Sequence, residues 1–363
     1  MRVQLIDPSA DVAPYDHALA RALAARGAEV ELVTSRFVHG PAPEPAGYSV
    51  STPFHRLATR TSADAPRRRR ALRLLEHVPD MLRYRGHAGE ADVRHYQWLP
   101  LPRLDARLLP RARPSLLTLH NVLRAERLEQ RLLERMDAVI VLTRAGAEVL
   151  TARHGIPQER VRVIPHGAFE HLTTQAHETP LPDELRHVEG PVVLCFGVVR
   201  PYKGVDVLLE AFRDVEAELW VVGRPLGESM ERLRRLAPAG KVRFVSRYVG
   251  DRELPAFFRR ADLLVLPHRR VDVSGVLFAG LAFGKPMVLS DVGGFRDVVE
   301  EHGAGRLVPP EDPEALGAAI RGLLDDGQAR AELAARARAA ADGPYAWSRV
   351  ACQTLNLYEE VLR

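Results

Sequence analysis

The sequence predicts an α/β protein of two domains, each built around a doubly wound parallel sheet. The chain has 363 residues, which is more than one hydrophobic core usually supports. Short apolar segments alternate with segments of helical periodicity, first over residues 1–170 and again over 191–344. Strands separated by helices are typical of parallel sheets covered on both faces. Residues 171–190 lack a hydrophobic period, so we expect the linker there.

In the first series we expect strands at Val3–Ile6 and Glu29–Thr34, with a helix between them at Tyr15–Arg26 that Gly27 ends. Residues 38–66 are rich in proline, serine and alanine and predict an irregular segment. A basic helix follows, and the remaining strands are expected at 92–96, 115–119, 138–142 and 161–164.

The second series predicts strands at 192–196, 219–222, 242–245, 263–266, 287–289 and 306–308. Helices separate most of them, and Asp312-Pro313 opens one of these helices with an N-cap and a proline. A last helix is expected from Trp347 to Leu362.

Composition places the protein among ordinary globular chains. Its 46% hydrophobic and 27% charged residues exclude a disordered protein. The N-terminus leads directly into a strand, which predicts no secretory signal, and no stretch approaches the roughly 20 apolar residues of a spanning helix. Cys195 and Cys352 have no metal or redox spacing and are expected to be buried. A cytoplasmic protein is therefore expected.

Positive charge is concentrated in the first half. Residues 1–180 hold 26 arginines and 20 acids, and the excess centres on Arg67–Arg73. One interpretation is a solvated helix face. The alternative is peripheral contact with an anionic membrane, on its inner face, or with an anionic acceptor. Nucleic acid is not expected, because no aromatic residues are interleaved with these arginines.

Residues 195–213 are the most informative stretch of the chain. An apolar strand ends at Gly197, and a helical pattern starts after Lys203. Arg200 and Lys203 therefore lie at the carboxyl end of a strand, where open parallel sheets bind ligands. Only three lysines occur in the chain, against 48 arginines, so Lys203 indicates a need for a compact point charge. A phosphate is the expected ligand, although an ordinary turn with solvated charges would give the same pattern.

The segment Arg-Pro-Tyr-Lys-Gly at 200–204 resembles a motif of the family-four retaining glycosyltransferases. The resemblance implies the GT-B fold, in which two Rossmann-like domains face a cleft and the last helix, within 345–363, crosses back to the N-terminal domain. It also implies that the C-terminal domain binds a nucleoside diphosphate sugar and that the N-terminal domain binds the acceptor.

A second segment, Ser274 to Pro286, predicts a buried helix with Ser274 as N-cap. Its first amides, at Gly275 and Val276, could bind a diphosphate. Many family members carry two glutamates that bind the sugar and the ribose, and the resemblance aligns these with Val271 and Ala279. Neither side chain can replace a glutamate, so Asp272 becomes the candidate for the sugar hydroxyls.

The resemblance assigns further donor-binding positions. Gly197, and Gly223 with Arg224, follow strands below the nucleotide, and Arg247 with Tyr248 would hold the base. No Asp-x-Asp pair or metal-ligand cluster is evident, so we expect no metal and no cofactor, with UDP as the expected nucleotide of the donor.

On the acceptor side, His120 ends a predicted strand and resembles the family's histidine near the transferred sugar, which makes it a catalytic candidate beside Arg200 and Lys203. His166 is expected to shape its turn. The first loop lacks the paired glycines of relatives, and Asp11, Tyr15, Asp16 and His17 are acceptor candidates.

The sequence therefore predicts a retaining hexosyltransferase with an unidentified acceptor, which could be a glycan, a lipid-linked sugar or a small molecule. Two alternatives remain: a sugar-nucleotide epimerase of the same fold, and a two-lobed sugar-binding protein without chemistry.

Overall fold

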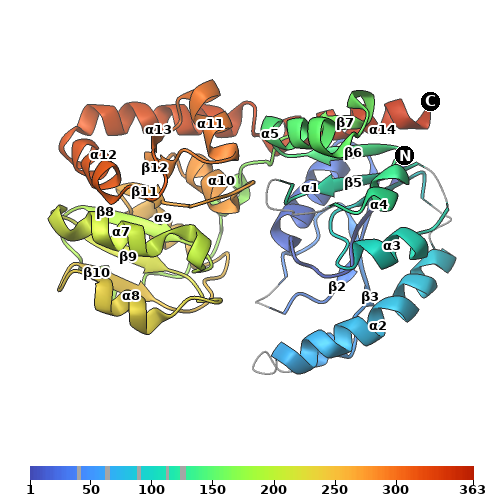
Figure 1. Ribbon diagram of the computed structural model, residues 1–363, viewed down its shortest axis with the longest axis horizontal. Helices are drawn as coiled ribbons and strands as arrows, with labels where there is room; N and C mark the ends of the chain where they lie inside the picture. The colour runs from blue at the N-terminus through green and yellow to red at the C-terminus, as the bar shows by residue number, and fades with distance from the viewer. Residues whose placement is uncertain (39–41, 62–65, 88–90, 112–113, 123–127) are drawn as a thin grey trace. The chain divides into compact units, whose positions relative to one another are not determined.

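The computed structural model describes residues 1–38, 42–61, 66–87, 91–111, 114–122 and 128–363. The chain divides into two compact units (Figure 1). Unit 1 consists of residues 1–167 and 347–363, and unit 2 of residues 168–346.

Unit 1 is built around a seven-stranded parallel sheet in the order β3-β2-β1-β4-β5-β6-β7. Its strands are β1 (Arg2–Asp7), β2 (Glu29–Ser35), β3 (Ser49–Phe54), β4 (Val93–Tyr96), β5 (Ser115–Leu119), β6 (Ala138–Val141) and β7 (Val161–Val163). Its α-helices are α1 (Ala13–Ala24), α2 (Pro66–His87), α3 (Pro102–Leu108), α4 (Gln130–Glu134), α5 (Arg144–Glu148) and α14 (Trp347–Leu362). The last helix, α14, packs against α1 and so returns the chain to unit 1, as the resemblance implied.

Unit 2 contains a six-stranded parallel sheet in the order β10-β9-β8-β11-β12-β13. Its strands are β8 (Val192–Phe196), β9 (Glu218–Val222), β10 (Val242–Val245), β11 (Leu263–Leu266), β12 (Met287–Ser290) and β13 (Arg306–Val308). Its helices are α6 (Asp183–Arg186), α7 (Val205–Ala211), α8 (Met230–Leu236), α9 (Leu254–Arg260), α10 (Gly275–Ala282), α11 (Gly294–His302), α12 (Pro313–Asp325) and α13 (Gly327–Asp342).

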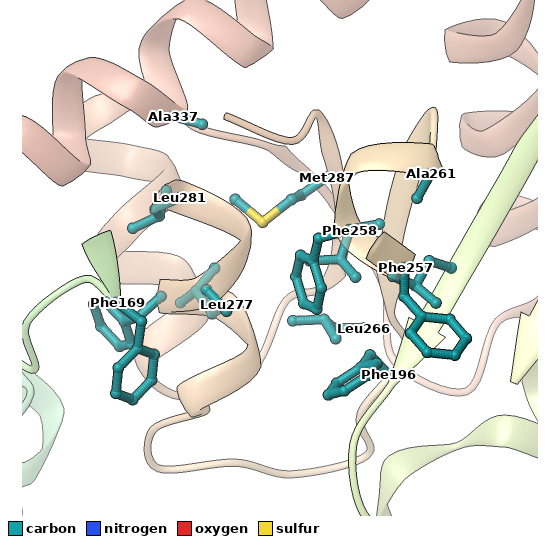
Figure 2. Close-up of a cluster of buried hydrophobic side chains, with 14 of the residues drawn as sticks. Phe169, Phe196, Phe257, Phe258, Ala261, Leu266, Leu277, Leu281, Met287 and Ala337 are labelled. Carbon is teal, nitrogen blue, oxygen red and sulfur yellow. The ribbon is translucent and has the colours of Figure 1, made fainter. Parts of the chain in front are cut away.

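Alternate residues of the central strands of unit 2 enter two different cores. In β8, Leu194 and Phe196 face one cluster, and Val193 and Cys195 face the other. Helices α9, α10 and α13 close the first core, where Phe196 lies with Phe257, Phe258 and Leu277 (Figure 2). Burial on both faces explains the uninterrupted apolar runs of these strands. The predicted doubly wound fold is thus confirmed in both units.

Two segments differ from expectation. The irregular segment predicted at 38–66 contains β3, whose residues are mostly half-buried at the edge of the sheet, so the apolar signal is weak. Pro53 is tolerated there because an edge strand leaves one side without ladder hydrogen bonds. The expected linker at 171–190 packs on unit 2: Leu172 and Leu185 enter its core, and Arg259 pairs with Glu178 at 2.7 Å.

Candidate functional site

The carboxyl ends of β8 and β9 meet at two glycines. Gly197 has φ +103° and Gly223 has φ +147°, both unfavourable for residues with a Cβ atom. A Cβ atom on Gly223 would lie 2.1 Å from the carbonyl oxygen of Gly197, so the two backbones are in direct contact. This edge of the sheet therefore presents backbone without side chains at both strand ends.

Lys203 lies at the same edge, on the short turn η6 (Pro201–Lys203). A Cβ atom on Gly197 would be 2.9 Å from Nζ of Lys203 and 3.0 Å from Cγ2 of Val276. The structure thus brings Lys203 together with the end of β8 and the first turn of α10. Arg200 precedes η6 and is exposed, and no carboxylate of the described chain pairs with it.

Helix α10 begins at Gly275, directly after its N-cap Ser274. The Ser274 side chain accepts no capping hydrogen bond, so it does not occupy the first amides of the helix. Leu277 to Leu281 are buried, as the all-apolar pattern predicted, while Gly275 is exposed. The exposed start of α10 therefore lies beside Lys203 with its positive dipole end available to an anion.

The other donor-binding candidates are placed differently. Arg247 is bound in a bidentate pair to Glu253, at 2.6 and 3.0 Å. Burial and the charge of Asp251 raise the pKa of Tyr248, and the charge of Arg224 opposes this rise. Asp272 is buried, with 3% of its surface exposed. Its backbone carbonyl accepts a hydrogen bond from Gly294 N at 3.1 Å, which ties it to the turn before α11.

The two positions aligned with family glutamates are part of the apolar core. Val271 and Ala279 are 5% and 3% exposed and belong to the cluster that covers one face of the unit 2 sheet. A carboxylate at either position would be costly to bury without a partner. Apolar side chains at these two positions therefore suit the local packing.

In unit 1, His120 follows β5 and lies in an aromatic cluster. The Tyr15 ring makes edge-on contacts with His120 at 4.9 Å, His166 at 5.0 Å and Trp347 at 5.2 Å between centroids. The histidine of the β7 turn, His166, donates from Nδ1 to the carbonyl of Gly167 at 2.7 Å, consistent with a role in shaping that turn. The structure therefore brings the acceptor candidate Tyr15 next to the catalytic candidate His120.

Burial keeps these histidines neutral. It lowers the pKa of His120 to about 3, with further lowering from His166 and His95, and lowers that of His166 to about 4. The His120 Nε2 atom lies 3.4 Å from Oε1 of Gln97. At neutral pH the His120 imidazole is therefore uncharged, and it can donate a hydrogen bond to a ligand or accept one from it.

Asp16 and His17, but not the preceding Tyr15, line a cavity of about 290 Å³ together with Thr34 and Ser35. The Asp16 carboxyl is buried against Asp7, and burial and this neighbouring carboxyl raise its pKa well above the usual value. Asp11 is about half-exposed, and its Oδ1 lies 3.9 Å from Nη1 of Arg73. The sequence analysis did not identify Asp7 as a neighbour of Asp16. The two residues are nine positions apart, and this spacing matches no recognisable motif.

Two further observations concern metal binding and membrane crossing. In the part of the chain that the structure describes, no three His, Cys, Asp or Glu side chains are grouped to hold a metal ion. Across the same residues, no helix combines the length and apolarity that crossing a bilayer would need.

Each of the two units matches a known protein family. Residues 13–168 match the family described as Glycosyltransferase Family 4, and residues 190–326 match Glycosyl transferases group 1. D-inositol 3-phosphate glycosyltransferase of Xylanimonas cellulosilytica is 28% identical over 95% of this chain and 90% of its own. Phosphatidyl-myo-inositol mannosyltransferase of Mycolicibacterium smegmatis is 38% identical over 48% of this chain and 46% of its own.

Solved structures share the fold over the whole chain. Sucrose-phosphate synthase from Thermosynechococcus elongatus has a TM-score of 0.74 at 22% identity, covering 99% of this chain and 98% of its own. HepE of Anabaena, in complex with UDP-glucose, has a TM-score of 0.74 at 19% identity, covering 99% and 100%. The chain thus consists of a Glycosyltransferase Family 4 domain followed by a Glycosyl transferases group 1 domain, and it is a glycosyltransferase of the GT-B fold.

Proposed function

We propose that the protein transfers a hexose-type sugar from a nucleoside diphosphate sugar to an acceptor, with retention at the anomeric carbon. The observation that carries the proposal is the position of Lys203 beside bare backbone at Gly197 and the exposed start of α10. Arg200 adds an exposed cation next to the same turn. Two cations and a helix N-terminus together suit a diphosphate.

These groups would act on the leaving diphosphate. As the bond between the anomeric carbon and the diphosphate breaks, negative charge develops on the leaving oxygen, and the acceptor oxygen forms the new bond. Fixed positive groups at that point stabilise the transition state more than the ground state. Retention is supported by the resemblance to family-four enzymes, and we assign no enzymic nucleophile.

His120 is proposed to hold a hydroxyl of the transferred sugar. Its lowered pKa, about 3, means that it does so as a neutral imidazole and not as a cationic acid. Asp272 remains the candidate for a second sugar contact, and Tyr15, beside His120, is the acceptor candidate best placed to assist.

UDP is the nucleotide we propose for the donor. Structures of Anabaena HepE in complex with UDP and with UDP-glucose support this choice. We also propose that no metal is required, because Arg200, Lys203 and the α10 amides already supply positive charge. Turnover is then expected to persist in excess chelator, and a loss that only added metal restores would contradict this part of the proposal.

The acceptor is proposed to be lipid-linked or to lie at an anionic membrane, reached through α2. Arg67, Arg68 and Arg70 on this helix are exposed. Leu74, Leu75 and Leu82 are 50%, 74% and 51% exposed on the same helix. Exposed leucines beside arginines suit the boundary between lipid headgroups and acyl chains.

A matched lysine pair tests the donor site. Lys203→Ala should lose about 2–4 kcal/mol of transition-state stabilisation with UDP-sugars, the scale of one lost oxyanion donor. Lys241→Ala removes a surface lysine that pairs with Glu216 at 2.7 Å, far along the chain from the turn, and should leave turnover unchanged. Wild-type turnover in folded Lys203→Ala would refute the assignment.

A thermal-shift panel of UDP-, GDP- and dTDP-sugars, run on wild type and Lys203→Ala, identifies the nucleotide. Stabilisation by one nucleotide that Lys203→Ala abolishes would support the proposal. Binding without hydrolysis or transfer to any acceptor would favour the two-lobed binding protein instead.

A further inference from the structure

Arg269 binds the turn that carries Lys203. It stands three residues beyond β11, and its backbone N donates to the carbonyl of Tyr202 at 2.8 Å. Its Nη1 atom donates to the carbonyl of Pro201 at 2.7 Å. One residue thus satisfies two successive carbonyls of η6, directly before Lys203.

The same guanidinium also binds Asp206, in the first turn of α7. Nη1 and Nη2 of Arg269 lie 3.0 and 3.1 Å from the two carboxylate oxygens, a bidentate arrangement. Its Nε atom donates to Glu311 at 2.8 Å. Hydrogen bonds from Arg269 and Arg232 outweigh the effect of burial and lower the pKa of Asp206 to about 2, so Asp206 stays charged. Arg269 therefore joins η6, α7 and the loop before α12.

The turn is also fixed from its other side. Gly204, which follows Lys203, has φ +65°, and a Cβ atom on it would lie 2.0 Å from the carbonyl oxygen of Pro267. The backbone after Lys203 is thus pressed against the end of β11, while Arg269 holds the backbone before it. Lys203 is left with little backbone freedom.

From this geometry we infer that Arg269 is a positioning residue, which holds the Arg200–Lys203 turn in the conformation that binds the donor diphosphate. The effect of Arg269 on catalysis rests on the proposed function, whereas its effect on the conformation of the turn does not. Arg269 acts through Lys203 and need not touch the substrate. A lysine could not replace it, because only a planar guanidinium can bind the carboxylate in bidentate fashion and also reach a carbonyl.

A neighbouring arginine provides the matched control. Arg232 also binds Asp206, at 2.9 Å, but makes no hydrogen bond to η6. Arg269→Gln should weaken UDP binding and lower kcat/KM by about 10-fold to 100-fold, the cost of a small misplacement of a binding group. Arg269→Lys should restore only part of the loss, and Arg232→Gln should remain within about two-fold of wild type.

A double-mutant cycle separates positioning from general destabilisation. If Arg269 acts through Lys203, adding Arg269→Gln to Lys203→Ala should cause little further loss. Full additivity, or equal losses in Arg232→Gln and Arg269→Gln, would overturn the inference.

Amide hydrogen exchange in the ligand-free protein tests the turn without any substrate. The amides of Lys203 and Gly204 bond back to Arg200 and Pro201. They should exchange faster in Arg269→Gln and at the wild-type rate in Arg232→Gln. If exchange responds this way while wild type binds no nucleotide and transfers no sugar, the proposed function fails and the positioning role stands. Unchanged exchange in Arg269→Gln would refute the positioning role itself.

Discussion

Asp7 and Asp16 form a buried carboxyl pair at the start of α1. Asp7 accepts hydrogen bonds from the backbone N of Ser9 at 2.9 Å and of Val12 at 3.3 Å, so it shapes the first loop. Burial, then the charge of Asp11, raises the pKa of Asp7 to about 6, and burial with the charge of Asp7 raises the pKa of Asp16 well above its usual value. Two neighbouring buried carboxyls cannot both ionise easily, so the folded state favours a protonated, neutral Asp16.

Asp16→Asn should therefore preserve or increase stability at pH 7 to 8. An amide is neutral at every pH and nearly keeps the side-chain volume, whereas Asp16→Ala removes buried side-chain atoms and should cost about 0.5–3 kcal/mol. Because raised pKa values favour the folded state at low pH, wild type should lose this contribution as pH rises through 6, and Asp16→Asn should not. Urea unfolding at several pH values measures both effects. Equal destabilisation by Asn and Ala would contradict a neutral Asp16 in the wild type.

Gly197→Ala should damage the donor site by displacing Lys203. The new Cβ would meet Nζ and Val276 in a backbone conformation that already disfavours alanine. Gly190→Ala is the matched control, since Gly190 has φ +78° and an added Cβ would meet no atom within 4 Å. Both substitutions should cost about 1 kcal/mol or more through backbone strain, but only Gly197→Ala should also lose nucleotide binding in titration calorimetry. Wild-type binding in Gly197→Ala would contradict the close packing.

At the scale of elements, α2 offers a test of membrane contact. Replacing Arg67 and Arg68 with serine should weaken binding to anionic vesicles by about 2 kcal/mol, or roughly 30-fold. The same change at Arg234 and Arg235, exposed on α8, should have little effect. Vesicle co-sedimentation at low salt measures both. A wild-type protein that ignores anionic vesicles under these conditions would show that α2 is simply a solvated helix.

Elements with a strong apolar pattern were predictable from sequence. Strands such as Val192–Phe196 and Leu263–Leu266 were placed with their observed bounds because both of their faces are buried. Strand β3 was missed because it is half-buried at an edge, and α3 and α4 were missed because each is a short helix of seven or five residues.

The candidate site was predictable only where residues follow a strand end or begin a helix. Gly197, Lys203 and Gly275 could be placed at one edge of the sheet from the sequence pattern. The role of Arg269 could not, because a surface arginine after a strand has no pattern that reveals three separate partners. For the same reason, the pairing of Arg247 with Glu253 became evident only in the structure.

At the scale of the molecule, the two units should respond differently to acid. Burial lowers the pKa of His17, His55 and His166 to about 4, and that of His95 and His120 to about 3. Folded unit 1 thus binds fewer protons than the unfolded chain below pH 6.5, so stability is lost as pH falls from 6.5 toward 4. The Asp7–Asp16 pair opposes this trend. In unit 2, the contribution of Asp206 is fully present above its unfolded pKa of 3.8 and is lost only as pH falls toward about 2.

We therefore expect unit 1 to unfold before unit 2 at pH 5. Each buried histidine should cost about 1–2 kcal/mol there, a large part of a domain's stability. Trp220 is the buried tryptophan of unit 2, while Trp98 and Trp347 belong to unit 1. Single-tryptophan variants should give one melting transition for each unit, separated at pH 5 and closer at pH 8. Coincident transitions at pH 5 would contradict this prediction.

The return of α14 to unit 1 makes unit 2 an insertion within unit 1. Its two ends are adjacent: Ala168 N donates to the carbonyl of Tyr345 at 2.7 Å. The cut ends of unit 1 are adjacent too, since a Cβ atom on Gly167 would lie 2.4 Å from the Trp347 ring. A gene segment for residues 168–346 would therefore encode a domain whose two ends are adjacent. A short peptide bridge from Gly167 to Trp347 would rejoin the two parts of unit 1. Recombination could exchange unit 2, the half proposed to bind the sugar donor, as a single cassette and leave unit 1 continuous.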